Sequence, residues 1–276
     1  MKYAPYSIDP QRVHADFQRH TVLNEHYTAV ITGLGETLLQ RVAEFNLQPE
    51  SIVNLTAGQS VITAVLATHY PQAKVTTIDY MPLQLQLASL PIAAHSVDMV
   101  FCPMLLHWCI APENLMQEIQ RILKPNGVLL FSVLGPDSLI ELRQVLLTLS
   151  DKPYIPVFTD MHNWGDLLQN LKFKNPVVDV DYYTVYYNNF AQLMLNLRSQ
   201  GPTYFLREMN KGLITPHQWQ ELEHAYEAYR DAQGLALTLE VVCGIAFGPV
   251  LRSEEDLSAR ETSIPLQKVR RKTSRP

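Results

Sequence analysis

The chain has 276 residues, of which 47% are apolar and 18% are charged, and its formal net charge is −5. This length and apolar content predict one large folded domain, or one domain with an appendage, rather than a disordered chain. The small acidic excess argues against a general nucleic-acid-binding protein, which would carry a basic surplus.

The first half of the chain alternates predicted helices and strands. Apolar residues at steps of three and four predict helices, and short apolar or alternating runs bounded by turn residues predict strands. In chain order these elements are helix 10–47, strand 51–55, helix 61–69, strand 74–79, strand 97–103, helix 112–123 and strand 128–134. Such alternation predicts a doubly wound, mostly parallel α/β sheet with helices on both faces.

The pattern changes after Gly135. Asp137 is the predicted N-cap of a helix that runs to Leu149. The acids Asp179 and Asp181 alternate with valines, which predicts a strand with a solvated face. The other predicted elements are helix 164–171, strand 177–187, helix 190–198, helix 216–230 and strand 235–248 with a glycine break.

These patterns divide the chain into three regions. We expect an α/β domain with N-terminal helices over 1–150 and an appended α/β region over 151–250. The last segment, 251–276, has little apolar content and a basic end, which predicts a disordered tail.

The cysteines and the N-terminus indicate the compartment. Cys102, Cys109 and Cys243 show no C-x-x-C pairing, so no metal site is predicted. An odd set of cysteines is typical of reduced thiols in a cytoplasmic protein. The N-terminus lacks the apolar core of a signal peptide, and the apolar runs are too short to span a bilayer. We therefore expect a cytoplasmic protein without a membrane span.

One stretch has the arrangement of a nucleotide-type site. A strand, a turn of small residues, a helix and a second strand follow one another, and the second strand ends on Asp79. Backbone N–H groups at such a turn bind polar ligand groups, and an acid at this strand end accepts hydrogen bonds from ribose hydroxyls. The turn, NLTAGQS, contains one glycine, Gly58.

Three stretches of sequence carry a resemblance to a known family. The runs SVDMVFCPMLLHWC, LGPDSLIELRQ and LTLEVVCGIAFG resemble the malonyl-acyl-carrier-protein O-methyltransferases of biotin synthesis, which are class I S-adenosylmethionine-dependent methyltransferases. The similarity extends from about Gln11 to Pro249. It implies a Rossmann-like methyltransferase fold, S-adenosyl-L-methionine as cofactor, the malonyl form of acyl carrier protein as partner, and methylation of its free carboxyl.

The resemblance also implies site residues. It places at cofactor-binding positions Asn54, Gly58, Ser60 and Asp79, and on the substrate side His107, Trp108 and Arg198. It assigns no catalytic residue and no metal, because a malonyl carboxylate is already an anion at neutral pH and the transfer depends mainly on positioning. Two alternatives stay open at this point: Trp108 as a purely structural aromatic, and Arg198 as ordinary solvated surface.

The chain departs from the family pattern at two points. The family turn has an acid and then three alternate glycines, positions held here by Asn54, Thr56, Gly58 and Ser60. After Asp79 the chain is too short for both the helix and the third strand of the family. Residues 83–88 are therefore either a remnant strand or one or two helical turns, and the acid that contacts adenine is absent.

These departures make the cofactor motif degenerate and leave the enzymatic activity undecided. The alternatives are a non-catalytic paralogue that binds a carrier or another protein, and an assembly or modification factor like the arginine hydroxylase of mitochondrial complex I assembly. The sequence does not predict the oligomeric state.

Overall fold

The structure is a computed structural model that describes residues 11, 25–57, 61–85, 89–148, 155, 157–199 and 215–248. The strands are β1 (Ser51–Thr56), β2 (Lys74–Asp79), β3 (Val97–Pro103), β4 (Leu123–Leu134), β5 (Lys174–Tyr187), β6 (Arg230–Asp231) and β7 (Gly234–Phe247). The helices are α2 (Glu25–Gln40), α3 (Ile62–His69), α4 (Tyr80–Leu85), α5 (Pro112–Ile122), α6 (Ile140–Leu147), α7 (Met161–Asn170), α8 (Phe190–Ser199) and α10 (Pro216–Tyr226). Three 3-10 turns complete the described elements: η1 (Ala43–Phe45), η2 (Leu106–Trp108) and η3 (Glu227–Tyr229).

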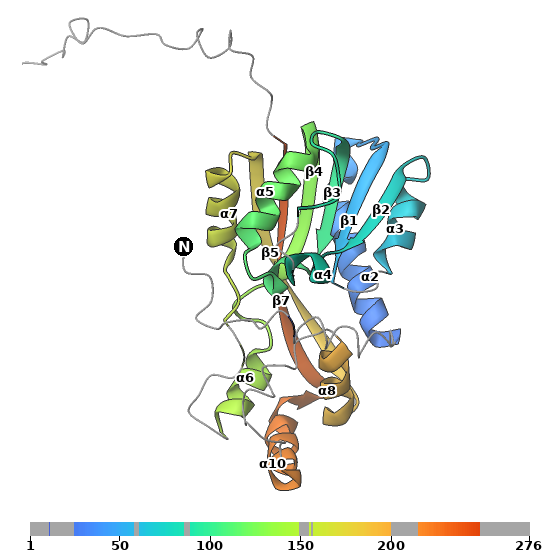
Figure 1. Ribbon diagram of the computed structural model, residues 1–276. Helices are drawn as coiled ribbons and strands as arrows, with labels where there is room; N and C mark the ends of the chain where they lie inside the picture. The colour runs from blue at the N-terminus through green and yellow to red at the C-terminus, as the bar shows by residue number, and fades with distance from the viewer. Residues whose placement is uncertain are drawn as a thin grey trace, which may run out of the picture.

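The strands form one seven-stranded sheet. Its order is β2-β1-β3-β4-β7-β5, and the short β6 pairs with β7 (Figure 1). The four strands β2, β1, β3 and β4 are parallel, whereas β7 and β5 run antiparallel to their neighbours. This order confirms the predicted doubly wound, mostly parallel α/β sheet. The three strands from the region after residue 150, β5, β6 and β7, belong to this same sheet, and the division of the chain into regions stays a prediction.

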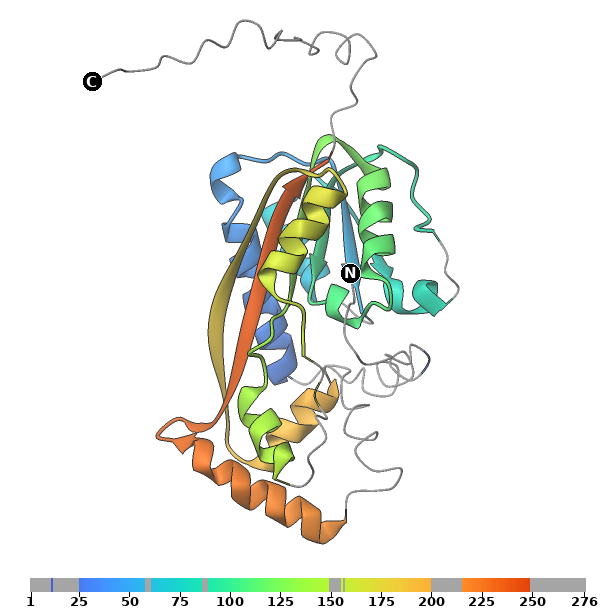
Figure 2. The ribbon, with the colours of Figure 1, turned by 90° about the vertical axis from the view of Figure 1, so that its left-hand side faces the viewer.

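Helices cover both faces of the sheet. On one face, apolar residues of α2 and α3 pack against inward residues of the central strands, such as Ile52 and Leu130. On the other face, α5 and α7 pack against the alternate residues, such as Val53 and Leu129. Figures 1 and 2 show these two layers from perpendicular directions. Alternate residues of the central strands face alternate helix layers, so β1, β3 and the second half of β4 are buried at almost every position.

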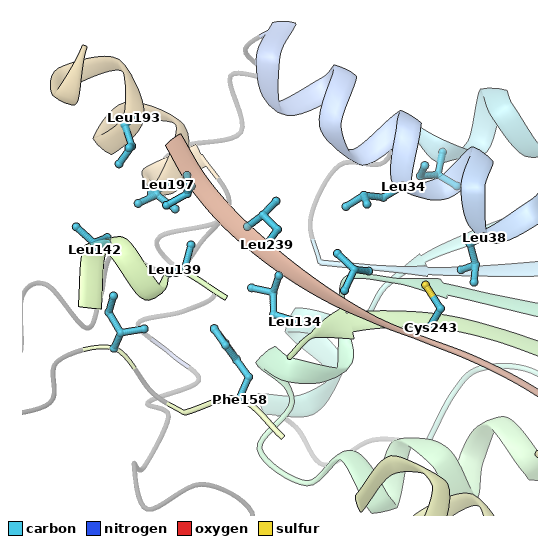
Figure 3. Packing of buried hydrophobic residues seen from close by; sticks show 14 of the residues in the cluster. Leu34, Leu38, Leu134, Leu139, Leu142, Phe158, Leu193, Leu197, Leu239 and Cys243 are labelled. Atoms are coloured by element: carbon cyan, nitrogen blue, oxygen red, sulfur yellow. The ribbon is translucent and has the colours of Figure 1, made fainter. Parts of the chain in front are cut away.

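A lobe extends the molecule beyond the carboxyl ends of the parallel strands. Strand β4 pairs with β7 only from Val241 onward, whereas the first half of β7 continues past β4 and pairs with β5 and, at its start, with the short β6. Helices α6 and α8 lie along one side of this extension and α10 lies at its lower end (Figure 2). Its interior is apolar, and Leu139, Leu142, Leu193, Leu197 and Leu239 belong to the same buried cluster as Leu134 of β4 (Figure 3).

Most predicted elements of the first half are confirmed with shifts of their ends: β4 begins at Leu123 rather than at residue 128, and the α-helix of the predicted region 10–47 ends at Gln40. The described part of this region holds α2 and then η1, and residues 12–24 lie outside the described residues. Of the two alternatives for residues 83–88, residues 83–85 form the end of α4 and are helical, while 86–88 lie outside the described part. The predicted tail, 251–276, also lies outside it.

Two predictions for the second half are wrong and a third is incomplete. Helix α6 is not capped by Asp137: its N-cap is Leu139, whose φ is 61°, and no side chain caps it. Strand β7 has no break at Gly244, because the strand runs continuously to Phe247. The acids of β5 are not simply solvated, since Arg41, in the turn directly after α2, forms ion pairs with both Asp179 and Asp181.

Candidate functional site

The carboxyl ends of the four parallel strands form one edge of the sheet. The last residues of these strands are Thr56, Asp79, Pro103 and Leu134. The chain leaves β1 toward β2 on one side, and β3 lies on the other side, so the strand order reverses beside β1. Ligands of open α/β sheets bind outside the carboxyl ends at such a switch point. This edge, which faces the lobe (Figure 2), is therefore the candidate site.

Asp79 lies at this edge, as predicted. It ends β2 directly beside Thr56, the last residue of β1, and its side chain is half-buried. Its Oδ1 accepts the backbone N–H of Met81 at 3.0 Å, which fixes the carboxylate at the start of α4. Asp79 is the only acid between Ser51 and Val97 in the sequence. Within residues 51–97 it is therefore the one carboxylate that can accept a hydrogen bond from a ligand hydroxyl at this end of β1 and β2.

Asn54 lies in the interior, beside α3 and β2. It is fully buried in β1 and its amide donates to the hydroxyls of Thr63 in α3, at 3.3 Å, and Thr77 in β2, at 3.5 Å. The two threonine hydroxyls lie 2.7 Å apart. Asn54 thus joins three elements at the base of the turn that follows β1. Its predicted contact with a cofactor stays a prediction.

The turn itself, with Gly58 and Ser60, lies outside the described residues. On its outer side β2 is the terminal strand, since within the described part of the sheet it pairs only with β1. After β2, the short helix α4 buries Tyr80 and Met81 in the core on the α5 side. Of the helix and the third strand that the family pattern has after this point, the described residues contain the helix, α4, and no strand that pairs with the outer side of β2.

A strained turn places His107 and Trp108 over the carboxyl end of β3. Met104 has a φ of 51°, and its N–H donates to the carbonyl of Ser132 in β4 at 2.8 Å. Residues other than glycine rarely adopt this conformation, and such strain is concentrated at functional sites. The turn redirects the chain from β3 into η2, which contains both predicted residues.

The rings around η2 form a small aromatic cluster. The His107 ring lies 4.6 Å from that of Trp108 and 5.7 Å from that of Phe158, with an edge-on arrangement to Phe158. Trp108 is 3% exposed and belongs to the core on the α5 side, which is the structural alternative for this residue. Phe158 comes from the connection between α6 and α7, and no sequence signal pointed to it. Burial lowers the pKa of His107 to about 3, so the ring is neutral near pH 7.

The end of β4 is fixed by Glu240 of β7, a residue that the sequence did not indicate. Its backbone carbonyl accepts from Gly135 N–H at 2.8 Å, and its carboxylate accepts from Asp137 N–H at 2.5 Å. Ser138 exchanges two hydrogen bonds with its backbone, at 2.9 and 3.0 Å. A Cβ on Gly135 would lie 2.4 Å from Glu240 Cδ, so only glycine fits there.

The remaining predicted groups are placed as follows. Arg198 lies in α8, and its side chain lies outside the described part of the chain. All three cysteines are buried free thiols, and burial raises their pKa. Within the described ranges, no three His, Cys, Asp or Glu residues are grouped as metal ligands. The same ranges contain no helix with the length and apolar character needed to cross a membrane.

Comparisons with known proteins identify the family. Residues 46–131 match the model of a methyltransferase domain. Malonyl-acyl-carrier-protein O-methyltransferase 1 of Coxiella burnetii is 30% identical, over 99% of this chain and 100% of that protein. The chain belongs to the malonyl-acyl-carrier-protein O-methyltransferase family. Members from Methylovorus sp. and Legionella pneumophila are 30% and 29% identical and cover 90% and 93% of this chain, and 92% and 96% of their own lengths.

Membership of this class I methyltransferase family implies S-adenosylmethionine at the edge described above. The hydrogen-bonding groups at this edge show which parts of the cofactor the described residues fit. A ribose diol requires a hydrogen-bond acceptor, and the half-buried Asp79 carboxylate provides one at the end of β2. For the adenine amine, no acid occurs from Tyr80 to Val97. The described residues therefore fit the ribose of the cofactor, while a carboxylate for the adenine is lacking.

Proposed function

We propose that this protein transfers a methyl group from S-adenosylmethionine to the free carboxyl of malonyl-acyl carrier protein, the reaction that serves biotin synthesis. The observation that carries the proposal is the match along the whole chain. The Coxiella burnetii relative is aligned over 100% of its length, so the similarity includes the lobe as well as the parallel sheet. Asp79 at the switch point supports the same conclusion.

The chain contributes mainly positioning to this reaction. Bound S-adenosylmethionine supplies a sulfonium methyl that is already electrophilic. Asp79 accepts hydrogen bonds from the ribose and thereby orients the donor. The malonyl carboxylate needs no general base, because it is ionised at neutral pH. The protein instead holds the two groups in line and excludes water, which can account for much of the rate enhancement.

The lobe supplies the substrate side in this proposal. The aromatic cluster at η2 lies between the strand ends and the apolar interior of the lobe, since Phe158 is buried together with Leu134 and Leu139 (Figure 3). We assign to Arg198 of α8 a contact with the acyl carrier protein, because such carriers are acidic and a basic residue complements them. This arrangement brings the carrier-bound acyl group to the edge that holds the donor.

The test is a methyl-transfer assay on the full chain. Purified protein is incubated with S-adenosylmethionine bearing a labelled methyl and with malonyl-acyl carrier protein, and the ester is measured by mass spectrometry. Acetyl-acyl carrier protein, which has no free carboxyl, is the matched control. Label on the malonyl carrier alone supports the proposal. A folded protein that transfers no methyl to the malonyl carrier contradicts it.

A second candidate is a non-catalytic paralogue that retains the carrier-binding surface. Two observations favour it. β2 is the terminal strand of the described sheet, and the Asn54 amide donates hydrogen bonds to Thr63 and Thr77 within the protein. Calorimetric titration with S-adenosylmethionine and with S-adenosylhomocysteine separates the two candidates. Saturable heat favours the enzyme. If heat appears only after the combined substitutions Asn54→Asp, Thr56→Gly and Ser60→Gly, the pocket is a relic.

A further inference from the structure

The Nδ1 atom of His107 is a buried polar atom without a protein partner. It has essentially no accessible surface, and among the described residues no hydrogen-bonding atom reaches it. The large majority of buried side-chain polar atoms in native proteins have a partner. An unsatisfied one costs about 1–3 kcal/mol. An atom of this kind at a ligand-binding edge indicates that the missing partner belongs to the ligand.

The position of the ring restricts what that ligand group can be. His107 follows β3 by four residues, at the edge where β1 and β4 also end. Its neighbours are the rings of Trp108 and Phe158, so the surroundings are apolar and electrostatic interactions there are strong. The S-adenosylmethionine that we propose as the methyl donor lies beside Asp79 of β2, and β2 is two strands away from β3. A ligand group at His107 is therefore on the acyl side of the reaction.

We propose that His107 Nδ1 donates a hydrogen bond to the carboxylate of the carrier-bound malonyl group and so determines the preference for a substrate with a free carboxyl. This inference rests on the proposed function. A carboxylate has two oxygens, and the bond holds one of them while the other remains available to attack the methyl. The donor must be the Nδ1–H tautomer, because a carboxylate oxygen can only accept.

A neutral donor suits this task better than a cation. The attack of a carboxylate on a sulfonium neutralises both charges, so the carboxylate is less negative in the transition state than in the bound substrate. A cationic side chain would stabilise the bound substrate more than the transition state, and this would slow the reaction. The neutral imidazole orients the oxygen with a smaller loss of reactivity. His107 is thus a substrate-binding residue rather than a general base.

The experiment compares carrier binding by variants of His107 in the full chain. His107→Phe keeps a ring against Trp108 and Phe158 but removes the donor, and His107→Asn keeps an N–H donor close to the position of Nδ1. His69→Phe, at an exposed histidine that ends α3 on the opposite edge of the sheet, is the matched control. Affinities for malonyl- and acetyl-acyl carrier protein are measured for each, together with S-adenosylmethionine affinity and thermal unfolding.

We expect the wild type and His69→Phe to bind the malonyl carrier more tightly than the acetyl carrier. In His107→Phe this preference falls about tenfold, which corresponds to the free energy of one net hydrogen bond. The affinity for S-adenosylmethionine and the melting temperature do not fall. His107→Asn recovers most of it. The proposal is overturned if the wild type shows no preference, if His107→Phe keeps the preference, or if both carriers weaken equally. Binding is measured without turnover, so a protein that binds as expected but transfers no methyl would refute the proposed function and not the role of His107.

Discussion

The carboxylate of Glu240 accepts the backbone N–H of Asp137 at 2.5 Å, and this bond joins the turn after β4 to the antiparallel strand β7. The two residues are 103 positions apart. Glu240 is only 5% exposed, and burial raises its pKa, with a further increase from the nearby carboxylates of Asp137 and Asp160. The protein therefore buries an acid beside its candidate site to hold one loop in place.

Two substitutions of Glu240 separate its hydrogen bond from its charge. Glu240→Ala leaves the Asp137 N–H without its acceptor, and we expect the free energy of unfolding to fall by about 1–3 kcal/mol. Glu240→Gln keeps an oxygen acceptor and removes the charge. Because the folded pKa is raised, the stability that protonation of Glu240 contributes is present below its ordinary pKa of 4.5 and is lost as the pH rises.

The glutamine variant should therefore gain stability relative to the wild type between pH 4.5 and pH 7. Urea unfolding of the wild type, Glu240→Ala and Glu240→Gln at both pH values measures this. If Glu240→Gln and the wild type have equal free energies of unfolding at both pH values, the fold does not disfavour the ionised form of Glu240.

Asp79→Asn tests the ribose contact. The variant keeps an oxygen for the Met81 N–H but loses the charge that strengthens hydrogen bonds from ribose hydroxyls. Bonds to a charged group are worth about 1.5–3 kcal/mol, so we expect S-adenosylmethionine affinity to fall about 10- to 100-fold while the melting temperature changes little. Calorimetric titration gives the affinity. Wild-type affinity in the variant would remove Asp79 from the site.

Asp98 provides the opposite case, an acid that stabilises the fold at the amino end of β3. Burial alone would raise its pKa, but hydrogen bonds from Lys124, at 2.8 Å, and from Ser51 outweigh this effect and lower it. Its contribution is therefore present at neutral pH and is lost as the pH falls through the lowered pKa. Asp98→Asn should destabilise the protein by about 1–3 kcal/mol at pH 7 and by less at pH 3.5, with donor affinity unchanged. Urea unfolding at both pH values is the measurement, and an equal loss at both would contradict it.

The sequence predicted those parts of the fold whose causes are local. β1, β2 and β3 could be located from short apolar or alternating runs bounded by turn residues, and Asp79 could be placed at the edge because it ends such a run. The failures are positions decided by distant residues. Asp137 has the chemistry of an N-cap, yet its N–H is bound by Glu240, and the helix begins after Leu139 instead.

The same reasoning explains what was missed at the site. The cluster at η2 includes Phe158, which reaches His107 from a connection about 50 positions later, and no local pattern encodes that approach. The acids of β5 looked solvated because their partner, Arg41, lies in the turn after α2, 138 and 140 positions away in the sequence. Strand ends and periodicity thus predict where a site lies, while the residues that close it depend on the tertiary packing.

Gly244 is a further residue whose role depends on tertiary packing, and its surroundings yield a prediction. It lies opposite Phe131 across the β4–β7 pair, and a Cβ there would lie 2.0 Å from Phe131 Cε1. Gly244→Ala should therefore cost about 1–3 kcal/mol of stability through overpacking, although alanine is otherwise well accepted in place of a strand glycine. Phe131→Leu should relieve part of this cost. Urea unfolding of both single variants and the double variant gives the coupling, and additive effects would contradict the contact.

The neutrality of His107 makes a prediction about pH that a general base would not satisfy. Burial is the only cause that lowers its pKa, to about 3, and no charged side chain contributes. The imidazole therefore stays uncharged through the working range, and the ratio of kcat/KM between the wild type and His107→Asn should be constant from pH 5.5 to pH 8. A residue that titrates near its ordinary pKa of 6.5 would make this ratio change with an inflection in that range.

The free energy of unfolding, unlike this ratio, should depend on pH because of His107. Between pH 3 and pH 6.5 the unfolded chain binds a proton at His107 that the folded chain does not, so wild-type stability rises with pH in this window. His107→Phe lacks this proton in both states. We therefore expect the wild type to lose stability relative to His107→Phe as the pH falls below 6.5, and the difference to be constant above it. Parallel urea unfolding curves down to pH 4 would show instead that the ring is protonated in the folded protein, and a cationic donor would then face the substrate carboxylate.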